Sequence, residues 1–157
     1  MPNWFKNTLI LSHDDPQLIS RVRQTVESLE SRELQFLRER ESQAPHVRTT
    51  VPGLLGEFVP QPPEVANSTD MVLDEDGQSW PAWRVWADDN WGTKWDVFSA
   101  RVTESSDRRL TIHFETAWWA PVPWLHRMAE LGFTYTMRFV VYGSARAGTA
   151  SNANPSR

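Results

Sequence analysis

The stretch "TLILSHDDPQLISRVRQTVESL" (residues 8–29) decides the fold, because a short apolar run passes directly into a helical pattern. Asp15 is suited to cap a helix, and Pro16 to its first position, where a missing N–H costs nothing. The apolar residues that follow recur at spacings of four, four and three, which places them on one helix face. They are Leu18, Val22, Val26 and Leu29. We therefore expect a strand followed by an amphipathic helix that runs to about Ser42.

Further along the chain, apolar runs, alternating stretches and Gly or Pro stops predict the remaining elements. Leu110, Ile112, Phe114 and Thr116 share one strand face, and so do Phe133, Tyr135, Met137, Phe139 and Val141. The expected elements are a strand at 54–60, a short helix at 79–91 ended by Gly92, strands at 94–102, 110–117 and 133–142, and a helix within 121–132.

This order of elements predicts an α+β protein with a mostly antiparallel sheet and helices on one face, a two-layer sandwich. The 157 residues suit a single domain, which we place at 1–143. We expect an acidic loop at about 64–79, because that segment is polar and has no period. Residues 144–157 are rich in Gly, Ser, Ala and Asn, so we expect a disordered tail.

Composition excludes several classes of protein. No cysteine is present, which rules out disulfides and thiolate metal sites, and we expect no cofactor. Residues 1–15 lack the basic start and apolar run of a secretory signal, and no stretch has the roughly 20 apolar residues of a membrane span. We expect a cytoplasmic protein with no membrane contact.

The charge is negative and uneven. The net charge of −4 does not fit a duplex-DNA binder. Residues 57–96 hold nine acidic and two basic side chains, a net of −7. This segment is either a solvated loop or, around Asp74, Glu75 and Asp76, an acidic face that docks on a basic partner.

Two tryptophan-rich motifs are the candidate binding sites. In "NWGTKWD" (90–96), Trp91 and Trp95 either pack into a helix-to-strand corner or form stacking surfaces with Lys94 as a phosphate contact. If residue 95 lies in a strand, Lys94 and Asp96 share one face and can pair.

The second motif is "TAWWAPVPW" (116–124), which contains adjacent tryptophans at a strand end. Trp118 and Trp119 then point in opposite directions, one toward the core and one outward. An exposed tryptophan suits an interface anchor, although the ring can equally lie over the proline-fixed loop.

No pattern indicates catalysis. "PGLLGEF" (52–58) lacks the lysine and glycine spacing of a phosphate loop, and no serine sits in a nucleophile elbow. His113 and Glu115 share a strand face, which fits a solvated patch better than an acid–base pair. Asp88 and Asp89 diverge on a helix. We expect no enzyme and no metal site.

Four blocks of sequence resemble a known family. Three of them, "MPNWFKNTLILS", "NWGTKWD" and "FETAWWAPVPW", are similar to the signature blocks of the YubB-like ferredoxin-like domain family of phage and conjugative-plasmid proteins. The fourth, "FVPQPPE", resembles that family's strand followed by a proline pair. The resemblance implies a ferredoxin-like fold and carriage on mobile elements, with no iron–sulfur cluster and no agreed activity. The chain departs from the family at Phe5, where members usually have cysteine, and in "YGSARAG" (142–148), which lacks the usual acidic residue.

The leading hypothesis is a non-catalytic accessory protein of a phage or other mobile element. It would act by binding a host protein or a defence or nucleic-acid-handling complex. The alternative is a binder of single-stranded nucleic acid or a nucleotide through tryptophan stacking. An enzyme of unknown chemistry is the third possibility, and the sequence leaves the oligomeric state open.

Overall fold

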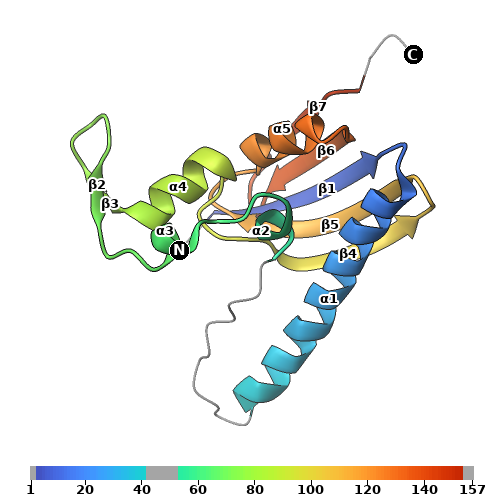
Figure 1. The fold of residues 1–157 in the computed structure, drawn as a ribbon, viewed down its shortest axis with the longest axis horizontal. Helices are drawn as coiled ribbons and strands as arrows, with labels where there is room; N and C mark the ends of the chain where they lie inside the picture. The colour runs from blue at the N-terminus through green and yellow to red at the C-terminus, as the bar shows by residue number, and fades with distance from the viewer. Residues whose placement is uncertain (1–2, 42–52, 154–157) are drawn as a thin grey trace.

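The computed structural model describes residues 3–41 and 53–153, apart from the side chains of 33–41. A five-stranded antiparallel sheet carries helices on one face, and a small β-hairpin stands away from it (Figure 1). The elements are β1 (Trp4–Ser12), α1 (Pro16–Glu41), α2 (Leu54–Phe58), α3 (Pro63–Ala66), β2 (Met71–Leu73), β3 (Ser79–Pro81), α4 (Ala82–Asn90), β4 (Phe98–Ser105), β5 (Arg109–Ala117), α5 (Val122–Glu130), β6 (Thr134–Val141) and β7 (Ala147–Ser151).

The first strand lies in the middle of the sheet. The strand order is β4-β5-β1-β6-β7, and β1 pairs antiparallel with β5 on one side and β6 on the other. Leu9 lies opposite Ile112 and Met137, and none of the three side chains is exposed to solvent. The predicted α+β class with an antiparallel sheet is therefore confirmed.

The opening stretch folds as predicted. Asp15 Oδ1 accepts the backbone N–H of Gln17 at 2.9 Å, so this side chain caps α1. Val22 and Val26 are fully buried in the core, together with Ile19, which the stripe had omitted. Helix α1 packs against β4 and β5 and so supports one half of the sheet.

The predicted strand at 54–60 is wrong, because residues 54–58 form the short helix α2. Two N–H groups in its first turn are bound by the distant carboxylate of Asp96. Leu54 and Leu55 are fully buried, so the apolar run is satisfied by a helical turn.

The predicted acidic loop at 64–79 is also wrong in part. Helix α3 covers its start, and β2 pairs with β3 across the turn at 74–78. The side chain of Asp74 closes that turn through backbone hydrogen bonds, which hydrophobic periodicity cannot reveal.

The predicted disordered tail is wrong for residues 147–151, which form strand β7 beside β6. This strand depends on backbone pairing, and Gly148 leaves room for the ring of Phe139. Asn152 then closes the ladder: its Oδ1 accepts the N–H of Tyr135 at 2.6 Å, and its Nδ2 donates to the carbonyl of Phe133 at 2.9 Å. Residues 154–157 lie outside the described residues.

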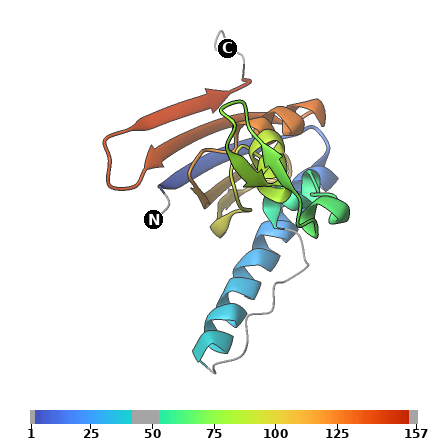
Figure 2. The ribbon, with the colours of Figure 1, turned by 90° about the vertical axis from the view of Figure 1, so that its left-hand side faces the viewer.

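The two sheet edges have different surroundings. Strand β7 forms one edge, and α1 extends beyond the opposite side of the sheet, beside β4 (Figure 2). The β2–β3 hairpin stands apart at the far end of α4 (Figure 1).

Candidate functional site

The first half of "NWGTKWD" is a structural corner. Trp91 is 7% exposed, and its indole N–H donates to the carbonyl of Val59 at 2.8 Å. Gly92 has φ of +83° and lies against the ring of Pro123. The hydroxyl of Thr93 is buried and donates to the carbonyl of Ala117 at 2.7 Å. Trp91 therefore offers no stacking surface to a ligand.

Asp96 also has a structural role. Its carboxylate accepts the N–H groups of Leu55 and Gly56, each at 2.9 Å, and so caps α2 from 40 residues away. A third bond, at 2.8 Å, comes from the N–H of Val97. Burial raises the pKa of Asp96, and the backbone donors act in the opposite direction.

Lys94 and Trp95 of the motif join Phe98 and the half-buried Trp4 in an aromatic row. The predicted strand start at residue 94 is wrong, because β4 begins at Phe98, so Lys94 does not pair with the inward-turned Asp96. Lys94 Nζ lies 4.4 Å from the ring centroid of Trp95, which is 37% exposed. Trp95 contacts the edge of Phe98, and Phe98 contacts Trp4.

The three predicted acidic residues lie together at the tip of the β2–β3 hairpin. Asp74 Oδ1 accepts the N–H groups of Asp76 and Gln78, and its Oδ2 accepts the indole N–H of Trp80 at 2.7 Å. These bonds, led by that of Trp80, lower the pKa of Asp74. Asp74 therefore organises the turn, and Glu75 and Asp76 are the exposed acidic groups.

Trp118 and Trp119 lie at the end of β5. Trp118 has φ of +77°, and its N–H donates to the carbonyl of Asn3 at 2.7 Å. This turn leaves Trp118 only partly buried, so the prediction that one of the pair enters the core is wrong. Trp119 is 65% exposed, and its ring centroid lies 6.4 Å from that of Phe5.

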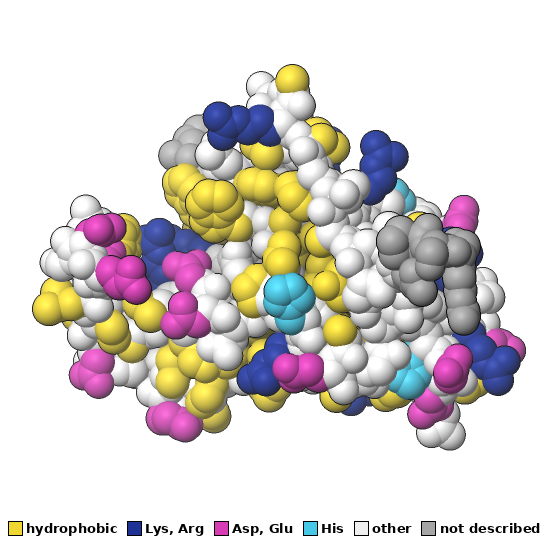
Figure 3. All heavy atoms as spheres, turned by 90° about the horizontal axis from the view of Figure 1, so that it is seen from above, with side chains coloured by type: hydrophobic (Ala, Val, Ile, Leu, Met, Phe, Trp, Pro, Cys, Tyr) yellow, Lys and Arg dark blue, Asp and Glu magenta, His cyan; other side chains and the backbone are white. Residues whose placement is uncertain are grey.

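Trp119 stands beside an open hollow of about 320 Å³. We call it the Trp119 hollow; it lies where the start of α5 meets β6 and β7, on a surface where hydrophobic side chains gather (Figure 3). Its lining is apolar except for Arg146. The lining residues are Phe5, Trp119, Ala120, Val122, Phe139, Val141, Arg146 and Ala147.

Sequence reasoning missed most of this hollow. The sequence predicts that Phe139 and Val141 share a strand face with Phe133, Tyr135 and Met137. Those three are buried, whereas Phe139 and Val141 remain partly exposed. Arg146 and Ala147 lie in the segment that the sequence predicts to be a disordered tail. In residues 144–151 the apolar side chains are Ala145, Ala147 and Ala150, which do not keep a two-residue period, so hydrophobic alternation gives no strand signal there.

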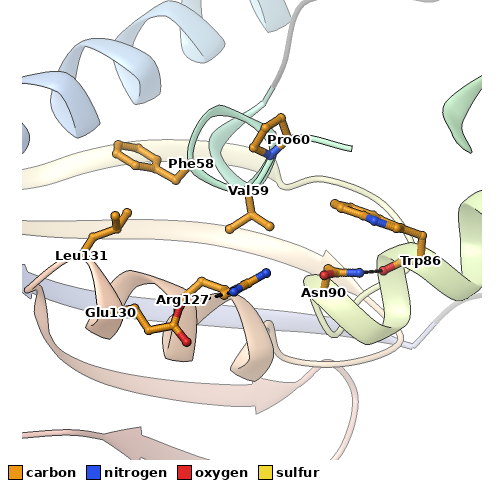
Figure 4. A pocket seen from close by; sticks show the side chains of 8 residues that line it. All are labelled: Phe58, Val59, Pro60, Trp86, Asn90, Arg127, Glu130 and Leu131. Carbon is orange, nitrogen blue, oxygen red and sulfur yellow. Dashed lines mark hydrogen bonds and ion pairs between the residues drawn. The ribbon is translucent and has the colours of Figure 1, made fainter. Parts of the chain in front are cut away.

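A second hollow, of about 360 Å³, follows the seam between α2, α4 and α5 (Figure 4). Its polar groups already have partners. Arg127 pairs with Glu130 at 3.3 Å, and Asn90 Nδ2 donates to the carbonyl of Trp86 at 2.9 Å. This hollow therefore resembles packing between helices more than a ligand site.

The described residues contain no group of three or more His, Cys, Asp or Glu side chains that could hold a metal ion. His113 Nδ1 lies 3.2 Å from the hydroxyl of Thr8 on the sheet face opposite the helices. Over residues 3–41 and 53–153, no helix has the length and apolar character needed to cross a membrane.

The predicted site residues therefore occupy separate places. The hairpin tip stands away from the sheet (Figure 1), and the aromatic row flanks β4, whereas the Trp119 hollow adjoins β7. Comparison with known proteins adds no analogy, because no family model, curated protein or solved structure matches the chain.

Proposed function

We propose that this protein is a non-catalytic binding protein that docks a partner protein in the Trp119 hollow. The observation that carries the proposal is the 65% exposure of Trp119 at the rim of an apolar hollow. A large aromatic ring left in water beside apolar surface is typical of an interface anchor.

The loop that presents Trp119 is held in place before any partner arrives. The hydroxyl of Thr116 donates to the carbonyl of Trp119 at 2.7 Å, and the backbone N–H of Trp118 donates to the carbonyl of Asn3. A pre-ordered anchor loses little conformational entropy on binding, which favours affinity.

The charge of Arg146 indicates which side chains a partner segment should carry. Within the described residues no carboxylate lies within ion-pair distance of its guanidinium. A matching partner segment would place an apolar side chain in the hollow and an acidic group beside Arg146.

We propose further that the fold is ferredoxin-like and that the chain belongs to the YubB-like family. The order β6-β1-β5-β4, with α1 and α5 as crossovers, supports the fold, and β7 and the segment from α2 to α4 would be additions. The sequence resemblance supports an accessory role on a phage or other mobile element, with a host protein or defence complex as partner. The exposed Glu75 and Asp76 would then contact a basic region of that partner.

The test uses a displayed library of random linear peptides selected against the wild-type protein. For the selected peptides, we expect Trp119→Ala to weaken binding by about 30-fold or more, equivalent to the roughly 2 kcal/mol of an aromatic anchor. Trp95→Ala is the matched control, since Trp95 is also an exposed ring but lies away from the hollow.

Thermal unfolding should separate binding from folding, because Trp119→Ala removes an exposed side chain and should leave stability within about 0.5 kcal/mol. Equal affinity in wild type and Trp119→Ala, or failure to select any peptide, would reject the proposal.

Single-stranded nucleic acid is the second candidate, and the aromatic row favours it. Trp95, Phe98 and Trp4 are in contact, and Lys94 lies over Trp95, which suits base stacking next to a phosphate. An unlabelled oligothymidylate should quench tryptophan fluorescence in the wild-type protein. Loss of this quenching in Trp95→Ala would support nucleic-acid binding over peptide binding.

A further inference from the structure

Among the residues that the structure describes, no strand pairs with the outer side of β7. The N–H of Val141 donates to the carbonyl of Arg146, and the N–H of Asn152 donates to the carbonyl of Tyr135. In an antiparallel ladder such pairs alternate, so the even-numbered residues of β7 bond to β6. The odd-numbered residues, Ala147, Thr149 and Ser151, direct their N–H and C=O groups away from the sheet.

The other edge of the sheet is protected. Strand β4 has two register shifts against β5, and it carries the charged residues Arg101 and Glu104. Helix α1 lies beside it, and Arg23 donates to the hydroxyl of Ser105 at 2.9 Å. Irregular pairing, charges and covering elements are the usual ways in which an edge strand avoids joining another chain.

Over residues 3–41 and 53–153, none of these protections is found at strand β7. Its sequence, "AGTAS", contains no charge and no proline, and its pairing with β6 runs without a register shift. Its first residue, Ala147, also lines the Trp119 hollow, as does Arg146 just before it. The open edge and the hollow therefore form one continuous surface.

We propose that the partner segment binds in an extended conformation along β7 and becomes a sixth strand of the sheet. This inference rests on the proposed function and specifies how the partner is held. Backbone hydrogen bonds to Ala147, Thr149 and Ser151 supply the attachment, and alternate side chains on the hollow side of the segment supply the selectivity.

The charge beside the edge favours a different protein over a second copy of this chain. Two copies paired through β7 would bring together residues 143–153, which contain no Asp or Glu, so these residues would supply no counter-charge to Arg146. A partner segment with an acidic residue near Arg146 satisfies that charge and fills the hollow.

Two variants at one position test the inference with the selected peptides. Thr149→Pro removes the outward N–H and keeps the pairing with β6 possible, because proline is tolerated on the outer side of an edge strand. Thr149→Ala removes the side chain and keeps the N–H. We expect Thr149→Pro to weaken binding at least tenfold and Thr149→Ala to leave it within about twofold, the tenfold loss corresponding to about 1.4 kcal/mol.

A second measurement leaves the protein unchanged. The peptide can also be methylated on one backbone nitrogen at a time. Methylation should weaken binding at every second residue of the peptide and leave it unchanged at the residues between, because only alternate N–H groups of an added strand face β7. Hydrogen exchange at Ala147, Thr149 and Ser151 should slow when the unmodified peptide binds.

The outcomes separate the two proposals. If Trp119→Ala abolishes binding but Thr149→Pro and all methylated peptides still bind, the hollow is the site and the added strand is wrong. If neither protein variant changes affinity, the proposed function itself fails. A dimer detected by light scattering and lost in Thr149→Pro would show that β7 pairs with a second copy, which also overturns the inference.

Discussion

The two edge strands of the sheet, β4 and β7, differ in regularity, in charge and in the elements that pack beside them. Strand β4 has irregular pairing, carries charged side chains and lies beside α1. The corner at 91–96, just before β4, is held by buried hydrogen bonds. Strand β7 is regular and has small side chains, and within the described part of the chain it pairs with β6 alone. The difference indicates that the fold closes the β4 edge and leaves the β7 edge available for binding.

The largest loss of folding stability is expected from a substitution in α1, beside β4. Val26→Asp places a charge in the core under α1, where the side chain is fully buried. An unpaired buried charge should cost about 3 kcal/mol or more, enough to unfold much of the protein. Urea unfolding followed by circular dichroism measures the loss.

Gln24→Asp, at an exposed position two residues earlier in α1, is the control and should change stability by about 0.5 kcal/mol or less. If Val26→Asp proved as stable as Gln24→Asp, α1 would not support its half of the sheet.

An intermediate effect is expected at the corner that leads into β4. Gly92→Val forces a branched residue to φ of +83° and drives its β-carbon into the ring of Pro123, so we expect a loss of about 2 kcal/mol or more. Gly77→Val is the matched control, because Gly77 has φ of +78° with no atom within 4 Å of the added β-carbon.

The Gly77 variant should lose only the backbone strain of about 1–2 kcal/mol, confined to the β2–β3 hairpin. Equal losses of global stability in the two variants would show that packing at the corner is unimportant and would weaken the contrast between the edges.

The smallest effect is a pH dependence at Asp96. Burial raises its pKa above the ordinary value of 3.8, so the folded protein holds this proton more tightly than the unfolded chain does. The resulting stability is fully present below pH 3.8 and is lost as pH rises through the folded pKa.

In Asp96→Asn, the free energy of unfolding should depend less on pH than in wild type above pH 3.8. The variant should also lose about 1 kcal/mol of stability, because the amide replaces one hydrogen-bond acceptor by a donor. Urea unfolding at a series of pH values measures both quantities. A variant profile that fell more steeply than the wild-type profile would contradict the assigned direction.

Hydrophobic periodicity was sufficient to predict the elements with large apolar faces. Strands β1, β5 and β6 and helices α1 and α5 were located because burial of their side chains dictates their spacing. The elements that were missed depend on polar or backbone interactions between distant residues. Helix α2 needs the carboxylate of Asp96, the β2–β3 hairpin needs Asp74, and β7 needs the backbone of β6.

The same distinction explains the candidate site. The adjacent tryptophans predicted an exposed ring, and Trp119 is exposed. The motif did not reveal that Trp91 and Asp96 are bound to groups far away in the sequence, since side-chain hydrogen bonds leave no periodic signal. The hollow itself depends on where α5 stops covering the sheet, which is a property of packing.

The central position of β1 has a consequence for how the chain folds during synthesis. Both neighbours of β1 come from the C-terminal half of the chain, and Leu9 meets Met137 only after nearly the whole domain has been made. At roughly 5–20 residues per second, the apolar segment at residues 9–11 emerges seconds before its partners. We therefore expect the growing chain to be a better substrate for ribosome-associated chaperones than the finished protein, and truncations that remove β6 to accumulate as aggregates.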